Sequence, residues 1–406
     1  MGIRVFFGSP RWEMNGVNTF HAALARELCK GGVDARLLFT RPAEPENGFP
    51  LPAGTPHCRL GTRRREGWVL RWRRLSRFLA HNSPCVYLPG YDEEFSCAAS
   101  LLPDAVAVVA AVHSDEPVHL DHAARIAPFA NRVVAVSALL ARKTTGLLPG
   151  HSGRVACIPC GVTPPPAAAR SEGRPLSLVW AGRMETRQKR VMDLAETAFL
   201  LAENGVPFRL TLYGDGPDKD ALADRLAPLR ARGLVDIRPP EAPHVLAEAF
   251  ARHDVLLLPS AFEGLPLVLL EAMAAGCVPV AARADSGVPE AVSHGENGLL
   301  VPVGDPAAMA GAVLHLDADR EALARMGKNA RETVADRFSL SRAAAAYRDL
   351  FAEVLEEAAS GRFVRPGGPV VPPPSIRFSP GPWGVAQKNR FLQSAKSLVL
   401  GLAGRP

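Results

Sequence analysis

The sequence predicts an α/β protein with two domains, each containing a parallel β-sheet. Short apolar stretches that end in proline, glycine or polar residues are typical of buried strands, and they recur in both halves of the chain between segments of helical period. A chain of 406 residues is also too long for one ordinary hydrophobic core. The hydrophobic content of 47% and charged content of 22% are those of a globular protein.

The first domain is expected over residues 1–165. An amphipathic helix is predicted at 18–30, where two glycines follow it. The predicted strands of this domain are 3–7, 33–40, 85–89, 106–113 and 132–137. Residues 163–175 are rich in proline and alanine and are expected to link the two domains.

The second domain is expected over residues 175–340. It begins with a strand, a polar loop and a helix, and a long helical segment is predicted at 306–335. Its further strands are predicted at 208–213, 235–238, 254–259 and 278–281. A last helix is expected at 341–360, and residues 361–406 are expected to form a Pro/Gly-rich linker with a short amphipathic tail.

Two acids, Glu263 and Glu271, lie where such a fold usually binds ligands. The loop that follows strand 254–259 is at the carboxyl end of a parallel strand, the edge at which open α/β sheets bind small molecules. Glu271 lies on the predicted helix 266–275, and its neighbours three and four positions away are all apolar. A carboxylate buried there requires hydrogen-bond donors, such as the hydroxyls of a ribose. A helix-end glutamate paired with an arginine is the alternative.

The segment EGLPLVLLEAMAAG, residues 263–276, resembles the E-x7-E signature of retaining GT-B glycosyltransferases, the group that includes glycogen-synthase-like and mannosyltransferase enzymes. The resemblance extends over residues 1–358 and implies two Rossmann-like domains that face each other across a donor-binding cleft. It also implies that Glu271 binds the nucleotide ribose and that Glu263 lies near the transferred sugar. By the same resemblance, the backbone amides of Gly264 and Leu265 contact the diphosphate.

Four further residues match the family's site. Gly16 corresponds to the loop that meets the donor phosphates, and His113 to a histidine near the donor sugar. Arg183 and Lys189 correspond to the pair that holds the pyrophosphate, where positive charge offsets the charge that grows on the leaving group. The alternatives are a plain turn at Gly16, a structural histidine at His113 and a solvated basic loop at 183–189.

The chain departs from the family pattern at several positions. Arg190 follows Lys189 where the family usually has a glycine, and Asn15 precedes Gly16 where it often has a second glycine. Cys160 and Thr163 replace an asparagine and an aspartate at the domain junction. These departures put the local loop geometry and some polar contacts in question.

Several function classes are disfavoured by what the sequence lacks. There is no G-x-G-x-x-G motif for a nicotinamide or flavin, and no D-x-D-like pair stands where a metal would be expected, so no cofactor and metal-independent catalysis are expected. The seven scattered cysteines suit a reducing cytoplasm, and the Cys157-x-x-Cys160 pair is expected to be structural. No signal-peptide pattern and no apolar run of about 18 residues is present, so a cytoplasmic location is expected.

The net charge of +6 favours anionic partners, although no nucleic-acid motif accompanies it. In the predicted helix 66–79, two tryptophans and two leucines share one face, and Arg71, Arg73, Arg74 and Arg77 lie off it. This helix either packs on the sheet with a solvated basic side or, together with the tail 383–406, contacts the inner face of a membrane.

The sequence thus predicts transfer of a sugar from a nucleotide diphosphate sugar to an acceptor hydroxyl, with retention of configuration. The acceptor would be a sugar, a lipid-linked molecule or another small molecule. A sugar-nucleotide epimerase of similar fold and a non-catalytic sugar-nucleotide-binding protein remain alternatives. A phosphorylase would need a pyridoxal-binding lysine and a longer chain, and the sequence shows neither.

Overall fold

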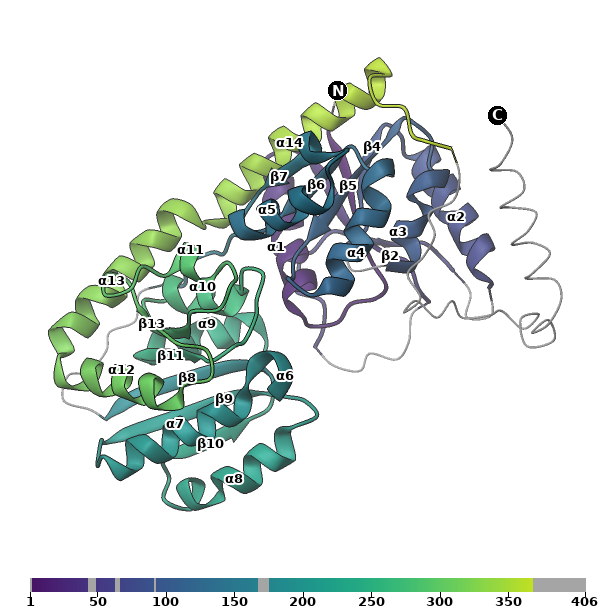
Figure 1. Ribbon diagram of the computed structural model, residues 1–406. Coiled ribbons are helices and arrows are strands. Elements are labelled where there is room, and N and C mark those ends of the chain that lie inside the picture. The colour runs from purple at the N-terminus through teal and green to yellow at the C-terminus, as the bar shows by residue number, and fades with distance from the viewer. Residues whose placement is uncertain (1, 43–48, 63–65, 91–92, 167–174, 368–406) are drawn as a thin grey trace.

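The computed structural model describes residues 2–42, 49–62, 66–90, 93–166 and 175–367. Two parallel β-sheets, each flanked by helices, form two domains that lie side by side (Figure 1). The expectation of an α/β protein with two parallel sheets is therefore confirmed. The tail 383–406 lies outside the described residues.

The N-terminal domain contains a seven-stranded sheet in the order β3-β2-β1-β4-β5-β6-β7. The strand order turns back beside β1, so that β1 pairs with both β2 and β4. The strands are β1 (Arg4–Ser9), β2 (Asp34–Phe39), β3 (His57–Arg59), β4 (Cys85–Leu88), β5 (Val106–Val112), β6 (Arg132–Ala135) and β7 (Val155–Cys157). The helices are α1 (Gly16–Lys30), α2 (Trp68–His81), α3 (Glu93–Ser96), α4 (Pro117–Ile126) and α5 (Ala138–Leu147), with 3-10 turns at Cys97–Leu101, Ala127–Phe129 and Ser152–Arg154.

The C-terminal domain repeats this pattern with a six-stranded sheet in the order β10-β9-β8-β11-β12-β13. Its strands are β8 (Leu176–Arg183), β9 (Phe208–Asp215), β10 (Val235–Arg238), β11 (Val255–Leu258), β12 (Val278–Ala282) and β13 (Leu299–Val301). Its helices are α6 (Thr186–Lys189), α7 (Val191–Glu203), α8 (Lys219–Ala231), α9 (Pro243–Arg252), α10 (Leu267–Ala274), α11 (Val288–Ala291), α12 (Pro306–Ala318) and α13 (Arg320–Arg337). In both domains the strand order turns back beside the first strand, and the crevice at such a point is where doubly wound sheets bind ligands.

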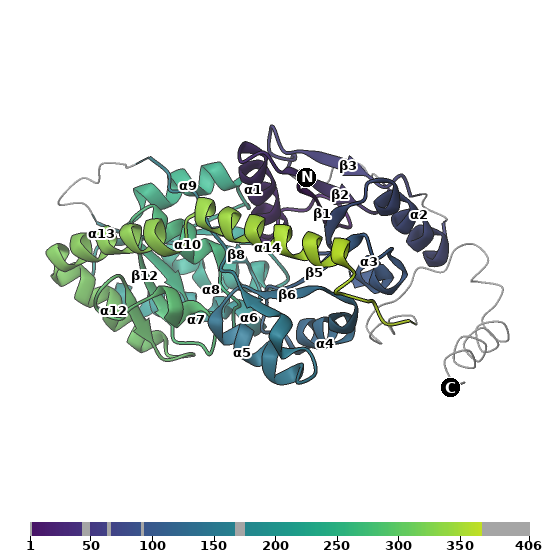
Figure 2. The same cartoon turned by 90° about the horizontal axis from the view of Figure 1, so that it is seen from above.

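The last helix, α14 (Leu340–Ser360), joins the two domains. It continues the direction of α13 and runs from the C-terminal domain along the N-terminal domain (Figure 2). Its buried aromatic residues pack into the N-terminal core, with Phe351 6.3 Å from Phe7 and Tyr347 6.2 Å from Phe20 between ring centroids. Arg132 at the start of β6 pairs with Glu353 and Glu357 on the outer side of α14.

The segment 306–335 is helical, as predicted. The segment 306–335 forms two helices, because Asp319 ends α12 and its carboxylate caps α13 by accepting a 2.8 Å hydrogen bond from the N–H of Ala322. No helix of the described part is long and apolar enough to cross a membrane.

The basic helix differs from its prediction. Arg71 does not lie on a solvated side, because it is buried and donates to the buried carboxylate of Glu94 at 3.0 Å. Trp72 is buried as well, and its indole N–H donates to the backbone oxygen of Glu94. The outward side of α2 instead exposes Arg73 and Arg77 together with Val69 and Leu70.

Candidate active site

The two domains meet where the carboxyl end of β5 faces the loop that follows β11. A Cβ atom on Gly264 would lie 2.0 Å from the carbonyl oxygen of His113, so only glycine fits at this contact. Nearby, a Cβ on Gly16 at the start of α1 would lie 3.8 Å from Leu267 at the start of α10. The structure thus brings residues predicted from three separate segments to one interdomain contact.

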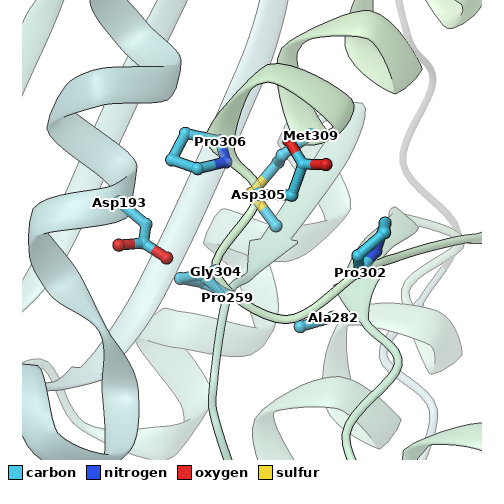
Figure 3. A pocket seen from close by; sticks show the side chains of 8 residues that line it. All are labelled: Asp193, Pro259, Ala282, Pro302, Gly304, Asp305, Pro306 and Met309. Carbon is cyan, nitrogen blue, oxygen red and sulfur yellow. The ribbon is translucent and has the colours of Figure 1, made fainter.

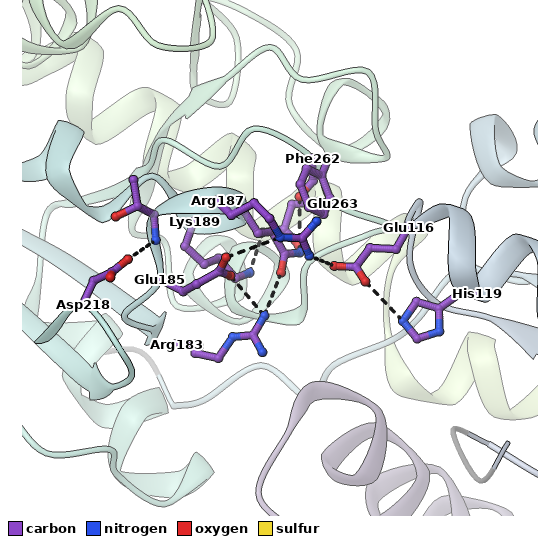
Figure 4. Close-up of polar contacts among 11 residues, drawn as sticks. Glu116, His119, Arg183, Glu185, Arg187, Lys189, Asp218, Phe262 and Glu263 are labelled. Carbon is purple, nitrogen blue, oxygen red and sulfur yellow. Dashed lines mark hydrogen bonds and ion pairs between the residues drawn. The ribbon is translucent and has the colours of Figure 1, made fainter. Parts of the chain in front are cut away.

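Lys189 and Glu263 form an ion pair at the centre of this site, with Nζ 2.5 Å from Oε1 (Figure 4). Glu263 is buried, and Lys189 ends the short helix α6. The loop before Lys189 is tied to the same segment, since the N–H of Ala261 donates to the oxygen of Gln188 at 2.8 Å. A buried ion pair needs such a fixed geometry to offset the desolvation of both charges.

Arg183 lies at the exposed end of β8, close to Lys189. Its guanidinium donates to Glu185 at 3.1 Å and lies 3.5 Å from the amide oxygen of Gln188. More than half of its side chain is exposed to solvent. The head group of Arg183 is therefore held only by surface contacts, which a bound anion can replace at small cost.

The residue after Lys189 has a left-handed backbone conformation, which glycine adopts without strain. Arg190 has φ 49° and ψ 45°, in the left-handed region. Its guanidinium holds Asp193 through two hydrogen bonds of 2.7 and 3.2 Å, and its head group also lies against Gly304. The ion pair with Asp193 holds Arg190 in this conformation and offsets a backbone strain of about 1 kcal/mol.

Glu271 lies on α10 behind this loop, and the apolar surroundings expected for it are present. Burial raises the pKa of its carboxyl to about 7. Among the described residues no side chain pairs with this carboxyl, so the predicted alternative of an arginine partner is not seen there. Among the described residues, the ionised carboxylate of Glu271 therefore has no side-chain partner that offsets the cost of its burial.

His113 follows β5 and its ring packs toward α1. The ring centroid lies 5.4 Å from that of His21 and 6.3 Å from that of Phe20. Burial, with a smaller contribution from His119, lowers the pKa of His113 to about 4. The ring is consequently neutral near pH 7 and suits hydrogen bonding to a hydroxyl better than charge compensation.

The backbone after Glu263 offers free donors. Among the described residues, the N–H groups of Gly264 and Leu265 donate no hydrogen bond, whereas the oxygen of Gly264 accepts one from the N–H of Gly287 at 2.7 Å. Leu265 is buried, so these amides are sheltered from bulk water. Two adjacent N–H groups at the start of a helix are suited to an anion.

Sequence reasoning missed the polar contacts that hold the domains together around this site. Arg187 of α6 reaches Glu116 of the N-terminal domain at 2.7 Å, and Glu116 also faces His119 (Figure 4). The carboxylate of Glu290 accepts two 2.8 Å hydrogen bonds from the first N–H groups of α5, and Lys143 bridges Asp115 and Asp285. These residues lie on helices and loops of ordinary composition, so only the domain arrangement reveals their pairing.

A shallow hollow lies at the carboxyl ends of β11, β12 and β13, but it contains none of the predicted site residues (Figure 3). Its empty volume is about 160 Å³, which includes open solvent. The hollow is too narrow to enclose a water molecule. Its lining consists of Asp193, Pro259, Ala282, Pro302, Gly304, Asp305, Pro306 and Met309. Within the described part of the chain, no three His, Cys, Asp or Glu side chains gather as metal ligands.

Comparison with known proteins finds a family match in the C-terminal domain. Residues 175–319 match the family model described as glycosyl transferases group 1. The chain is 34% identical over 174 residues to N-acetyl-alpha-D-glucosaminyl L-malate synthase of Bacillus anthracis, covering 43% of this chain and 45% of that protein. It is 40% identical over 201 residues to D-inositol 3-phosphate glycosyltransferase of Streptomyces bingchenggensis, covering 47% and 44%. The matched part spans about half the length of these curated relatives.

Solved structures resemble the chain over a greater length. The Anabaena protein HepE, solved with UDP and glucose, superposes with a TM-score of 0.69 and 15% identity, covering 86% of this chain and 100% of that one. Sucrose-phosphate synthase of Thermosynechococcus elongatus superposes with a TM-score of 0.68 and 20% identity, covering 88% and 100%. At such identities the likeness shows the fold, which is the GT-B arrangement of two Rossmann-like domains.

Proposed function

We propose that this chain, which carries a glycosyl transferases group 1 domain at residues 175–319 of a GT-B fold, transfers a sugar from a nucleotide diphosphate sugar to an acceptor hydroxyl. The anomeric configuration is retained, as the E-x7-E resemblance implies. The observation that carries the proposal is the arrangement of the Lys189–Glu263 pair, the free amides of Gly264 and Leu265, and Glu271 around one interdomain contact.

The donor diphosphate binds between the basic loop and the amides. Its oxygens replace Glu263 as the partner of Lys189 and replace Glu185 as the partner of Arg183. The N–H groups of Gly264 and Leu265 donate to the same phosphates. As the glycosidic bond breaks, negative charge grows on the diphosphate, and these donors stabilise it more strongly than they stabilise the ground state.

Glu271 holds the ribose. In the free protein its carboxyl has a pKa of about 7 because burial disfavours the charged form. Two ribose hydroxyls donating to the carboxylate would lower that pKa and fix the nucleoside. Glu263, released from Lys189, and His113 then face the transferred sugar from opposite domains, where the neutral imidazole can hydrogen-bond a hydroxyl.

The acceptor approaches from the N-terminal domain. A front-face displacement, in which the departing phosphate takes the proton of the acceptor hydroxyl, requires no carboxylate nucleophile and fits a site built from phosphate donors. Positive charge from Arg183 and Lys189 supports catalysis without a divalent metal. Full activity after excess EDTA is the expected result, and loss of activity that Mg²⁺ or Mn²⁺ restores would refute metal independence.

A thermal-shift screen against nucleotide diphosphate sugars, followed by product analysis, tests the function. A donor at about 100 times its Kd should stabilise the protein by roughly 2.7 kcal/mol. Incubation of that donor with candidate acceptors should then release the nucleoside diphosphate together with a glycosylated product. Conversion to an isomeric sugar nucleotide would favour an epimerase, and binding without any turnover would favour a non-catalytic binding protein.

A lipid-linked acceptor at the inner face of a membrane is the second part of the proposal. The observation that favours it is the outward side of α2, where Val69 and Leu70 are 41% and 55% exposed beside Arg73 and Arg77. Exposed apolar and basic side chains together suit an anionic bilayer surface. Trp68 and Trp72 take no part in this contact, because they pack against the N-terminal core.

A further inference from the structure

A second hollow lies away from the candidate active site, where the chain crosses between the domains. Its volume is about 300 Å³, at the lower end of the range for small-molecule sites. Strand β7 and the residues after it supply one wall, and the junction of α13 and α14 supplies the other. The lining residues are Cys157, Ile158, Pro159, Cys160, Arg337, Phe338, Ser339, Arg342, Ala343 and Ala346.

Two arginines give this hollow its charge. Arg337 ends α13 and Arg342 lies in the first turn of α14. Among the described residues neither forms an ion pair or hydrogen bond through its guanidinium, and Arg337 only stacks over Phe338 at 5.1 Å. By contrast, Arg132, Arg187 and Arg190 all have carboxylate partners. No carboxylate lines the hollow, so its positive charge is uncompensated there.

Apart from Ser339 and the two cysteines, the rest of the lining is apolar and includes the side chains of Ile158, Pro159, Phe338 and Ala346. The hollow also opens at the N-terminal end of α14, a 21-residue helix whose dipole favours negative charge at that end. A ligand that matches these features carries an anionic group next to an apolar body. Two guanidiniums favour a dianion over a monoanion.

Both interdomain segments meet beside the hollow. The N–H of Val162 donates to the oxygen of Phe338 and the N–H of Leu340 donates to the oxygen of Val162, each at 2.9 Å. A Cβ on Gly161 would lie only 2.5 Å from the oxygen of Ser339. A molecule in the hollow therefore contacts both chain crossings between the domains.

We propose that this hollow is a binding site for a small organic phosphate, held by Arg337 and Arg342 around its phosphate and by the apolar lining around its body. The site is separate from the residues assigned to sugar transfer, and its occupancy does not depend on that assignment. Its position gives the ligand a direct influence on the relative orientation of the domains.

Isothermal titration of the intact protein with phenyl phosphate tests the proposal. Phenyl phosphate should bind saturably. Inorganic phosphate and phenol should both bind more weakly, because inorganic phosphate lacks the apolar body and phenol lacks the phosphate group. The double variant Arg337→Gln/Arg342→Gln should weaken phenyl phosphate binding at least about fivefold, through loss of two charge-assisted contacts. Arg325→Gln/Arg348→Gln is the matched control, because it also removes one exposed arginine from each of α13 and α14 and should leave the affinity unchanged.

Two variants that each add a phenyl ring to α14 test the location of the binding site independently. Ala346→Phe should obstruct the hollow, whereas Ala345→Phe places the same side chain at the next exposed position of α14, outside the lining. Phenyl phosphate should also slow the alkylation of Cys157, which is exposed in the lining, relative to Cys29 in the N-terminal domain as an internal reference.

Absence of saturable phenyl phosphate binding at roughly 10 mM would overturn the proposal. So would binding that persists unchanged in both Arg337→Gln/Arg342→Gln and Ala346→Phe. Binding that disappears instead in Lys189→Ala would place the phosphate in the candidate active site and likewise refute a site at the domain crossing.

Discussion

Nζ of Lys189 lies 2.5 Å from Oε1 of Glu263, which joins the loop after β8 to the loop after β11. The positive charge of Lys189, which the proposed function assigns to binding the donor diphosphate, is thus already paired with a carboxylate of the protein. Under the proposed function, binding of the donor would therefore exchange one carboxylate partner of Lys189 for phosphate oxygens. The ion pair with Glu263 holds the Lys189 side chain in place before the donor arrives, which reduces the entropy cost of ordering this side chain on binding.

Lys189→Ala and Arg183→Ala are expected to slow turnover more than they weaken donor binding. Each removes positive charge where negative charge grows during bond cleavage, and loss of one such contact raises the barrier by about 2.7–4 kcal/mol, roughly 100- to 1000-fold in kcat. Steady-state kinetics with saturating acceptor measure the effect. Lys30→Ala provides the control, because that exposed lysine pairs with Glu27 at the end of α1 opposite Gly16.

A change in KM alone for both site variants would contradict the assignment of the leaving-group site. Lys189→Ala also leaves Glu263 buried without its partner, which costs stability. Kinetics should therefore be measured below the thermal midpoint of each variant, and Lys189→Ala should have a lower midpoint than Arg183→Ala, whose guanidinium is exposed.

Glu271 is expected to make the stability of the free protein depend on pH. Its pKa is about 7 in the folded protein and about 4.5 as an isolated group, so the folded state binds this proton more tightly than the unfolded state. The resulting stabilisation is fully present below pH 4.5 and is lost as the pH rises through 7. Thermal midpoints of the wild type, relative to Glu271→Gln, should therefore fall between about pH 5 and pH 8.

Donor binding should have the opposite pH dependence. Ribose hydroxyls stabilise the ionised carboxylate, so donor affinity should rise with pH up to about 7 and then level off. Glu271→Gln should bind the donor more weakly and lose this dependence. An unchanged affinity in Glu271→Gln, measured by titration with the donor found in the screen, would exclude Glu271 from the ribose site.

The fold was predictable because the strands of each sheet are buried and therefore apolar. The predicted strand at 235–238 coincides with β10, and the other strands predicted with bounds differ from the structure by one or two residues at one or both ends. The candidate site residues were predicted from the signature around Glu263 and Glu271, together with positions at strand ends. Their common location follows from parallel topology, which places the carboxyl ends of all strands at one edge.

The remaining features depend on tertiary contacts that a single sequence does not reveal. Arg71 has the composition of a surface residue, yet it is buried because Glu94, 23 positions later, offers a carboxylate in the core. Arg190 takes a backbone conformation that favours glycine, because Asp193 holds its side chain. In each case a long-range or local ion pair outweighs the preference of the isolated residue.

Gly264→Ala is expected to disrupt the contact between the domains. The added methyl group would lie 2.0 Å from the oxygen of His113, so the loop or β5 must shift. A displaced loop moves the Gly264 and Leu265 amides away from the diphosphate, and misplacement by about 1 Å can cost roughly 100-fold in rate. Gly311→Ala is the control, because nothing lies within 4 Å of a Cβ at that position on α12.

Gly311→Ala should be neutral or stabilising by up to about 1 kcal/mol, because alanine favours helix. Circular dichroism melting and turnover of both variants give the comparison. If Gly264→Ala retains wild-type turnover and stability, then the close approach of Gly264 to His113 is not required for the active arrangement.

The last prediction concerns the outward side of α2. Each exposed arginine near an anionic bilayer contributes about 1 kcal/mol, so Arg73→Gln/Arg77→Gln should weaken binding to anionic vesicles by roughly 10- to 30-fold. Arg230→Gln/Arg232→Gln is the control, because it removes the same charge from exposed positions in the C-terminal domain. It distinguishes a contact between α2 and the membrane from a general effect of net charge. Leu70→Ser should weaken binding further, because Leu70 is the most exposed apolar residue of the helix. Co-sedimentation with vesicles containing phosphatidylserine at physiological salt measures all three. Wild-type protein that stays in the supernatant, or equal losses in the two arginine pairs, would exclude α2 as a membrane contact and favour an acceptor that is not lipid-linked.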